Sequence, residues 1–232
     1  MTTGGKFVSK ILLAILATAI AAFLALAGNY FYKIKTGGVM SLQFTKSGAP
    51  MTEPGNLDSK KIISDKSPYF GAPNPELTVV VFGNFYCPNS QKVSETMREM
   101  MLKYRDKTKF IYREYPMDDV YQNSSYLALA GKCANEQNKF WPFYDKIYRN
   151  PSIDLATVDP QIGLESVKFL ECLKQSKYYA AIKNDLVDGF NSGVRGTPTF
   201  FFIKKSYENQ PLKIEGAIPR DTLEKIIEKL LK

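Results

Sequence analysis

The sequence predicts an α/β fold, in which a helical insertion interrupts one sheet and an apolar N-terminal helix precedes the domain. Three observations predict it. A continuous apolar run at 77–82 is typical of a buried strand, and a helical pattern follows it. A long helical block covers about 118–190. Strand character returns at 199–203, followed by a hairpin and a last amphipathic helix.

Composition narrows the class of protein. The chain has 232 residues, 44% hydrophobic and 13% aromatic, enough for one ample domain with appendages. Its net charge is +8, but Lys and Arg are scattered, so we expect a solvated basic surface and no nucleic-acid partner. Without histidine there is no Ser-His or Cys-His catalysis, and three cysteines are too few for a Cys₄ zinc site. We expect neither a metal nor another cofactor.

Residues 1–32 are predicted to be a signal anchor. An apolar run at 11–27 is broken only by Thr18, and with its flanks it reaches the roughly 20 residues that span a bilayer. A cleaved signal peptide is the alternative, because Ala25-Leu26-Ala27 matches an A-x-A site. Both alternatives imply that the rest of the chain is exported. An uncleaved anchor would hold it at the membrane on the periplasmic or extracellular side, where a disulfide persists.

Residues 33–66 are predicted to be a flexible tether, because they are rich in Gly, Ser, Thr, Pro and Lys. One short strand is expected there, at Lys61-Ile62-Ile63. The alternative is that part of this segment packs on the domain. The folded domain is predicted at 67–232, and it opens with a turn-rich stretch at 67–75.

The elements of the domain follow in order after the strand at 77–82. A helix is expected after Pro88, because apolar side chains recur on one face at helical spacing. A second strand is predicted at 110–112, ahead of the helical block. After the strand at 199–203 and the hairpin partner at 212–214, a last helix opens at Pro219. The apolar face of the first helix comprises Val93, Met97, Met100, Met101 and Tyr104.

The motif Cys87-Pro88-Asn89-Ser90 lies where the predicted buried strand gives way to a helix. A thiol there faces free backbone N–H groups and the positive end of the helix dipole, which favour the thiolate. A two-cysteine redox motif would have its second thiol at position 90, where this chain has Ser90. We therefore expect Cys87 to be a nucleophile, and Ser90 can donate a hydrogen bond to its sulfur.

Segment 67–232 resembles the DsbA-like branch of the thioredoxin superfamily. The matching features are the strand-Cys-Pro-x-x-helix unit at 79–104, Glu136-Gln137-Asn138-Lys139-Phe140-Trp141, Gly196-Thr197-Pro198-Thr199-Phe200-Phe201 and Ile214-Glu215-Gly216-Ala217. The resemblance implies a thioredoxin-like fold with a helical insertion. It also implies that Pro198 is cis and faces the active cysteine, and that the backbone of Thr197 binds an extended substrate. The alternative for Pro198 is an ordinary turn proline before an edge strand.

The chain departs from the family pattern at three places. Ser90 replaces the second cysteine, and Asn89 occupies the dipeptide in which the family often has a histidine. Val81 and Asn84 stand where acidic residues commonly precede the cysteine. The usual proton-handling groups are therefore missing together with one thiol.

Cys133 and Cys172 lie in the predicted helical insertion. Some relatives carry a structural disulfide in this region, and the resemblance implies one here. In an exported protein we favour it over two reduced, buried cysteines. Cys87 is then the unpaired thiol.

Three functions remain open. The favoured one is a membrane-tethered thiol-disulfide oxidoreductase or isomerase that acts through Cys87 alone, as an isomerase, monothiol reductase or mixed-disulfide former. Its partners would be cysteine-containing exported proteins, with a membrane redox partner or a small thiol clearing the intermediate. The second is a non-catalytic module that binds peptides or proteins. The third is a dithiol oxidoreductase whose second cysteine has been engineered to Ser90.

Overall fold

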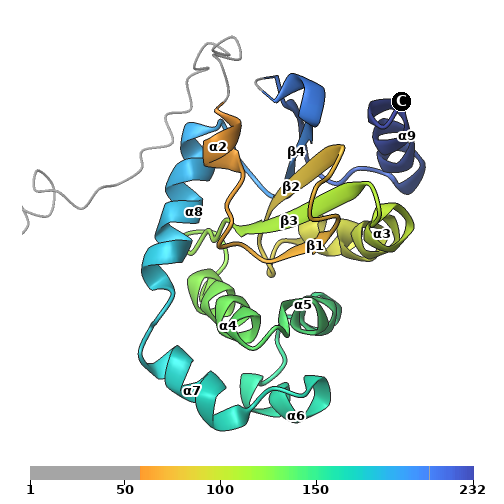
Figure 1. Cartoon of the computed structure of the whole chain (residues 1–232). Coiled ribbons are helices and arrows are strands. Elements are labelled where there is room, and N and C mark those ends of the chain that lie inside the picture. The colour runs from red at the N-terminus through yellow and green to blue at the C-terminus, as the bar shows by residue number, and fades with distance from the viewer. Residues whose placement is uncertain (1–57, 209) are drawn as a thin grey trace, which may run out of the picture. The chain divides into compact units, whose positions relative to one another are not determined.

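The computed structural model describes residues 58–208 and 210–232 (Figure 1). The predicted signal anchor at 1–32 and the predicted tether as far as residue 57 lie outside these ranges. Within the part of the chain that is described, no helix is both long and apolar enough to cross a membrane.

A five-stranded mixed sheet, in the order β1-β3-β2-β4-β5, forms the centre of the domain. Its central strand β2 (Leu77–Gly83) runs parallel to β3 (Thr108–Glu114) and antiparallel to β4 (Thr199–Lys204). The last strand β5 (Leu212–Glu215) pairs with β4 and closes the predicted hairpin. Every residue of β2 is buried, so the central strand predicted from its apolar run is confirmed.

The central strand β2 contributes to two apolar cores, because successive side chains of a strand point to opposite faces. Val79 and Val81 belong to the core that also holds residues of α3 (Pro88–Tyr104) and α9 (Arg220–Leu230). Val80 and Phe82 belong to the core on the other face. Figure 1 shows α3 and α9 on one side of the sheet, with α2 (Ser59–Ile62) and α8 (Tyr179–Asn191) on the other.

A helical insertion separates β3 from β4, where the sequence predicts a helical block. Figure 1 shows α4 to α7 gathered below the sheet, while α8 runs back up to it. The connection 150–158 holds one short 3₁₀ turn, Leu155–Thr157. Before α8, the helices are α4 (Ser124–Glu136), α5 (Phe140–Arg149), α6 (Asp159–Ile162) and α7 (Ser166–Lys174).

The strand predicted at Lys61-Ile62-Ile63 is wrong. This segment lies in and just after helix α2, whose first turn is capped by the side chain of Asp58, which accepts a hydrogen bond from the Lys60 N–H at 3.0 Å. Ile62 is fully buried in the core shared with α8. A local cap and one buried apolar side chain therefore decide the conformation, and three residues are too few to show either period.

The turn-rich stretch 67–75 contains a strand that the sequence does not predict. Strand β1 (Tyr69–Gly71) pairs antiparallel with β3 and forms an edge of the sheet. Gly71 makes the close pairing feasible, because its φ is +106° and a Cβ there would lie 2.1 Å from the carbonyl oxygen of Thr108.

A buried charged cluster holds α2 against the sheet. Arg113 of β3 donates two hydrogen bonds to one carboxylate oxygen of Asp185, at 2.9 and 2.7 Å, and Lys132 donates to the other at 2.6 Å. Arg113 also donates to the carbonyl oxygen of Ile62 at 3.2 Å. Helix α2, which lies in the segment predicted to be a tether, is therefore packed on the domain.

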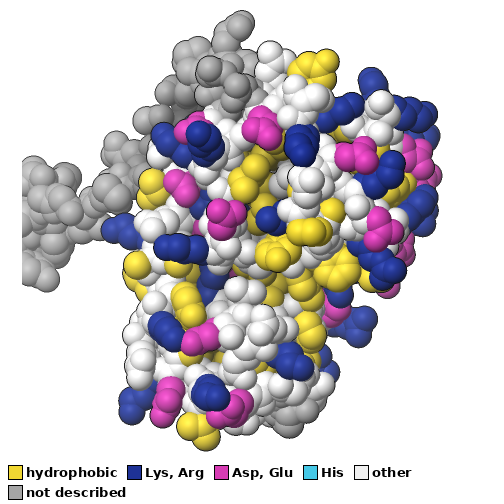
Figure 2. Space-filling model, in the orientation of Figure 1, with side chains coloured by type: hydrophobic (Ala, Val, Ile, Leu, Met, Phe, Trp, Pro, Cys, Tyr) yellow, Lys and Arg dark blue, Asp and Glu magenta, His cyan; other side chains and the backbone are white. Residues whose placement is uncertain are grey.

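The surface carries both signs of charge. Figure 2 shows Lys and Arg side chains interspersed with Asp and Glu on the face in view, with hydrophobic side chains between them. On this face the basic residues do not gather into one patch, which agrees with the scattered Lys and Arg of the sequence.

Candidate functional site

Cys87 lies at the N-cap of α3, immediately before Pro88. A short turn brings it there: the side chain of Asn84 accepts the Tyr86 N–H, and the Asn84 carbonyl oxygen accepts the Cys87 N–H, each at 3.0 Å. Proline suits the first helical position, since that N–H has no intrahelical partner. Asn84 therefore serves the turn that aims Cys87 at the start of the helix.

The loop before β4 brings Thr197 and Pro198 to Cys87. The Thr197–Pro198 peptide bond is cis. The Cys87 thiol donates to the carbonyl oxygen of Thr197 at 3.1 Å, across 110 residues of sequence. Only 4% of Cys87 is exposed. The structure thus unites the two motifs, and the backbone of Thr197 is the immediate neighbour of the thiol.

Two buried hydroxyls flank the sulfur. Ser90 Oγ and Thr197 Oγ1 have no hydrogen-bond partner among the described residues while Cys87 is a thiol. Burial by itself raises the pKa of Cys87, but interactions with the Thr197 side chain, the backbone of Ser90 and Asn89 and the Ser90 hydroxyl outweigh burial and lower it. The two free hydroxyls are donors that a thiolate can recruit, whereas a thiol leaves them unused.

Tyr121 is a site residue that the sequence does not reveal. It lies half-buried in the loop between β3 and α4. Burial raises the pKa of the Tyr121 hydroxyl, and the charge of Cys87 and a hydrogen bond with it raise that pKa further. The hydroxyl is therefore a third one beside the sulfur. A tyrosine in an aperiodic loop gives no signal from which this contact could be predicted.

Two buried tyrosines, Tyr148 and Tyr112, lie in the core near the first turn of α3. The hydroxyl of Tyr148 on α5 lies 2.8 Å from that of Tyr112 on β3. Burial raises the pKa of both hydroxyls well above the ordinary value, and the nearby Ser90 hydroxyl acts in the opposite direction on the pKa of Tyr148. Gln91, the residue after Ser90, also donates its side-chain amide to the Tyr148 carbonyl at 2.8 Å. Helix α5 is thus fixed to the first turn of α3.

Glu114, the last residue of β3, is a buried carboxyl that the sequence does not reveal as a site residue. It is 1% exposed, neither of its oxygens has a partner among the described residues, and it pairs in register with Gly83 of β2. Burial raises its pKa well above the ordinary value, Lys132 acts in the opposite direction, and Asp185 raises it further. The strand that leads to Cys87 lacks an acid, but the neighbouring strand β3 carries this buried one.

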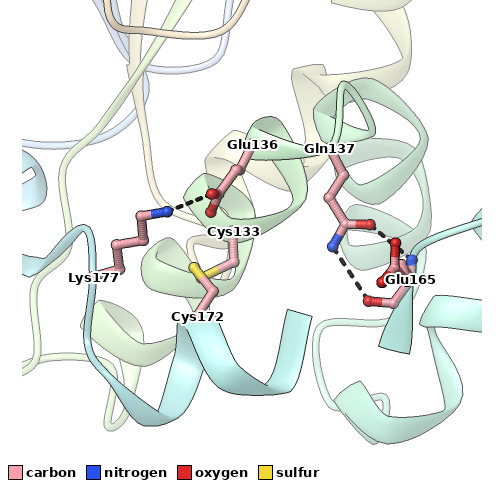
Figure 3. Close-up of a disulfide and its surroundings, with 6 residues drawn as sticks. All are labelled: Cys133, Glu136, Gln137, Glu165, Cys172 and Lys177. Carbon is pink, nitrogen blue, oxygen red and sulfur yellow. Dashed lines mark hydrogen bonds and ion pairs between the residues drawn. A yellow bond between two sulfur atoms is a disulfide. The ribbon is translucent and has the colours of Figure 1, made fainter. Parts of the chain in front are cut away.

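A disulfide joins Cys133 of α4 to Cys172 of α7, with the two Cα atoms 5.9 Å apart (Figure 3). Cys87 is the free cysteine. Figure 3 also shows the ion pair of Lys177 with Glu136 beside the disulfide. Cys172 lines a cleft of about 590 Å³ whose other walls are polar and charged, and no residue of the Cys87 site lines it.

Sequence comparison identifies the family. The family model described as Thioredoxin matches residues 64–229. Among curated proteins, the Na⁺/H⁺ antiporter NhaA 3 of Salinispora tropica is 28% identical over 156 residues, which are 66% of this chain and 24% of the antiporter. The chain spans about a quarter of the length of the curated relatives it matches.

Solved structures share the fold. The thiol-disulfide exchange protein alpha-DsbA2 of Wolbachia pipientis has a TM-score of 0.62 and 19% identity, over 74% of this chain and 90% of that one. A periplasmic thioredoxin-like protein of Salmonella enterica serovar Typhimurium has a TM-score of 0.59 and 23% identity, over 77% and 98%. The fold is thus a mixed α/β thioredoxin-like one with DsbA-like structural neighbours, and the chain belongs to the thioredoxin family.

Proposed function

We propose that this protein is an exported thiol-disulfide exchange protein that acts through Cys87 alone and is tethered to the membrane by residues 1–32. The observation that carries the proposal is the position of Cys87 at the start of α3, with Thr197 3.1 Å away and two unpartnered hydroxyls beside the sulfur. The relative from Wolbachia described as a thiol-disulfide exchange protein and the periplasmic relative from Salmonella support the chemistry and the location.

The chemistry needs one thiolate. Cys87 attacks one sulfur of a disulfide in a cysteine-containing exported protein, forms a mixed disulfide with it and releases the other sulfur as a thiolate, which takes up a proton. Ser90 has no thiol with which to displace the bound protein. A second thiol of that protein, a small thiol or a thiol of a membrane redox partner then attacks the mixed disulfide and releases Cys87 as a thiolate. The outcome is isomerisation or reduction.

The Thr197 loop supplies a place for the substrate backbone. In the thiol state the Thr197 carbonyl accepts the Cys87 S–H, and this bond ends when the proton leaves. The carbonyl oxygen has two lone pairs, and it can accept an N–H from an extended segment of the substrate, beside the sulfur that reacts. The same carbonyl oxygen therefore contacts the thiol and offers an acceptor to a substrate strand.

The rate of Cys87 alkylation against pH tests the activated thiol. The midpoint should lie below about 8.5, the value of a free cysteine. A midpoint at or above that value would overturn the proposal. Mixed disulfides should also be trapped on Cys87 in cells, and the matched control is the Cys87→Ala variant, which keeps the fold and loses the sulfur. Recovery of the same proteins with that variant would show that the capture does not involve the thiol.

A non-catalytic binding module is the second candidate, and the low exposure of Cys87, 4%, favours it. Gly196→Arg separates the two functions, because a Cβ at residue 196, next to Thr197 in the chain, has no neighbour within 4 Å, so a larger side chain can be attached there to obstruct the Thr197 loop. A binding module should lose its function with Gly196→Arg and keep it with Cys87→Ala. A thiol exchange protein should lose its function with Cys87→Ala.

Two further points of the proposal have direct tests. Replacement of residues 1–32 by a cleavable signal peptide should keep the export and move the protein from the membrane fraction to the fluid of the same compartment, and retention in the membrane would contradict the tether. The encoding gene shows whether position 90 is naturally serine. A cysteine codon there would make the natural protein a dithiol oxidoreductase.

A further inference from the structure

We propose that Tyr148, held by Tyr112, is a positioning residue that directs the hydroxyl proton of Ser90 toward the Cys87 thiolate. The inference rests on the proposed function, because it assumes that Cys87 reacts as a thiolate. The observations that carry it are the 2.8 Å contact between the two tyrosine hydroxyls, the hydrogen bond of the Gln91 side chain to the Tyr148 carbonyl, which holds Tyr148 against the first turn of α3, and the buried, unpartnered hydroxyl of Ser90 in that same turn, after Cys87 at the N-cap. We call Tyr112, Tyr148 and Ser90 the hydroxyl chain.

The hydrogen bond between Tyr112 and Tyr148 uses only one of their two hydroxyl hydrogens. Each hydroxyl has a single hydrogen, so when Tyr112 donates to Tyr148 the hydrogen of Tyr148 is free for another acceptor. Ser90 Oγ is the adjacent buried oxygen, and it lacks a partner among the described residues. A donor from Tyr148 would satisfy it, and a buried hydroxyl without a partner is unfavourable.

The negative charge on the sulfur orients the hydrogens of the hydroxyl chain. When Ser90 accepts from Tyr148, its own hydrogen is left to point at Cys87, and a thiolate is the strongest acceptor within its reach. Every bond then runs in one direction, from Tyr112 to Tyr148, to Ser90 and to the sulfur. Hydrogen bonds aligned in this way polarise one another and strengthen the last one. Without the hydroxyl of Tyr148, the Ser90 hydroxyl loses the partner that orients it.

The hydroxyl chain requires that Tyr112 and Tyr148 keep their hydroxyl protons. Burial is the main cause that raises the pKa of Tyr148, Tyr144 and Glu114 raise it further, and the opposite effects of Tyr112 and Ser90 do not outweigh them. Burial also dominates for Tyr112, whose neighbours Tyr148, Glu114 and Tyr144 act in the same direction. Tyr121, outside the hydroxyl chain, is the titratable group that faces Cys87. Both hydroxyls of the pair therefore remain donors throughout the range in which Cys87 titrates.

Alkylation of Cys87 by iodoacetamide against pH, on the full chain with its disulfide intact, tests the inference. Tyr148→Phe removes one hydroxyl and keeps the ring. It should raise the midpoint by about 0.3 pH unit, while Ser90→Ala should raise it by up to about one unit. Tyr144→Phe is the matched control, because Tyr144 is buried on the same helix and packs on Tyr148 with ring centroids 4.6 Å apart. It should leave the midpoint unchanged.

The decisive comparison places Tyr148→Phe in the Ser90→Ala background. If Tyr148 acts through Ser90, the second substitution has no further effect there. An equal rise in both backgrounds, or no rise with Ser90 present, would overturn the inference. Tyr112→Phe gives a second route should Tyr148→Phe fold poorly, and it should cause a smaller rise of the same kind, while an unchanged midpoint would also count against the inference. A wild-type midpoint at or above about 8.5 overturns the proposed function instead.

Discussion

Reduction of the disulfide between Cys133 and Cys172 should destabilise the domain substantially. The perturbation is made in a Cys87→Ala background, which removes the third thiol and prevents disulfide exchange. Oxidised and reduced protein then have the same sequence and differ only in this bond. The bond ties α4 to α7 within the insertion, so its loss frees a long loop of the unfolded chain.

The magnitude follows from the length of that loop. The two cysteines are 39 residues apart, and the chain-entropy relation then gives about 3.9 kcal/mol at 25 °C. For a protein of this size each kcal/mol moves the melting temperature by about 2–4 °C. We therefore expect the reduced form to melt roughly 8–16 °C lower, and its unfolding midpoint in urea to fall in proportion.

Urea unfolding followed by far-ultraviolet circular dichroism, with and without reductant, measures the difference. The double variant Cys133→Ala with Cys172→Ala is the control for the reductant, to which it should not respond. A free-energy difference between oxidised and reduced protein below about 1 kcal/mol would refute the reasoning. It would mean that the unfolded chain is restricted in the same way without the bond.

The remaining predictions concern buried groups. Glu114→Gln should stabilise the protein at neutral pH, because the pKa of this carboxyl is raised in the folded state, which therefore binds a proton that the unfolded chain has lost. The free energy of unfolding of the wild type should accordingly fall, relative to that of the variant, as the pH rises above about 4.3, by at most about 1.4 kcal/mol per pH unit. Urea unfolding between pH 4 and 8 checks this, and a constant difference would contradict it. Gly83→Ala should cost about 1–3 kcal/mol, because its Cβ would lie 2.5 Å from the Tyr112 hydroxyl; an unchanged melting temperature would speak against that contact. Ile62→Ala should cost about 2–5 kcal/mol, because Ile62 is fully buried, and a loss below 1 kcal/mol in urea unfolding would show that α2 is not part of the core.

The sequence predicts the central sheet because its strands are long apolar runs. The segments 77–82 and 199–203 each hold enough consecutive buried residues to be distinguished from loops. It fails at α2 and β1, which have four and three residues. Elements of that length show no period, and their conformation depends on contacts with Arg113 and β3, which lie far along the chain.

The site is predictable only where a motif marks it. Cys87 and Ser90 are found from the strand-to-helix transition, and Pro198 from its loop. Tyr148 cannot be found in this way, because it belongs to the apolar face of a helix and reads as an ordinary core residue. Glu114 ends a buried strand, and a charged residue after an apolar run normally marks the exposed end of a strand. Their proximity to the site exists only once β3 and α5 have packed.

Arg113 also determines how the domain would respond to tension. Its guanidinium holds the carbonyl oxygens of Lys61 and Ile62 while it is bonded to Asp185 of α8. A force applied at Asp58 is therefore transmitted to β3 and α8 through buried, charge-assisted hydrogen bonds. Pulling from this end has to break that cluster before it can peel off β1, so the domain is mechanically clamped at the point where the chain enters it.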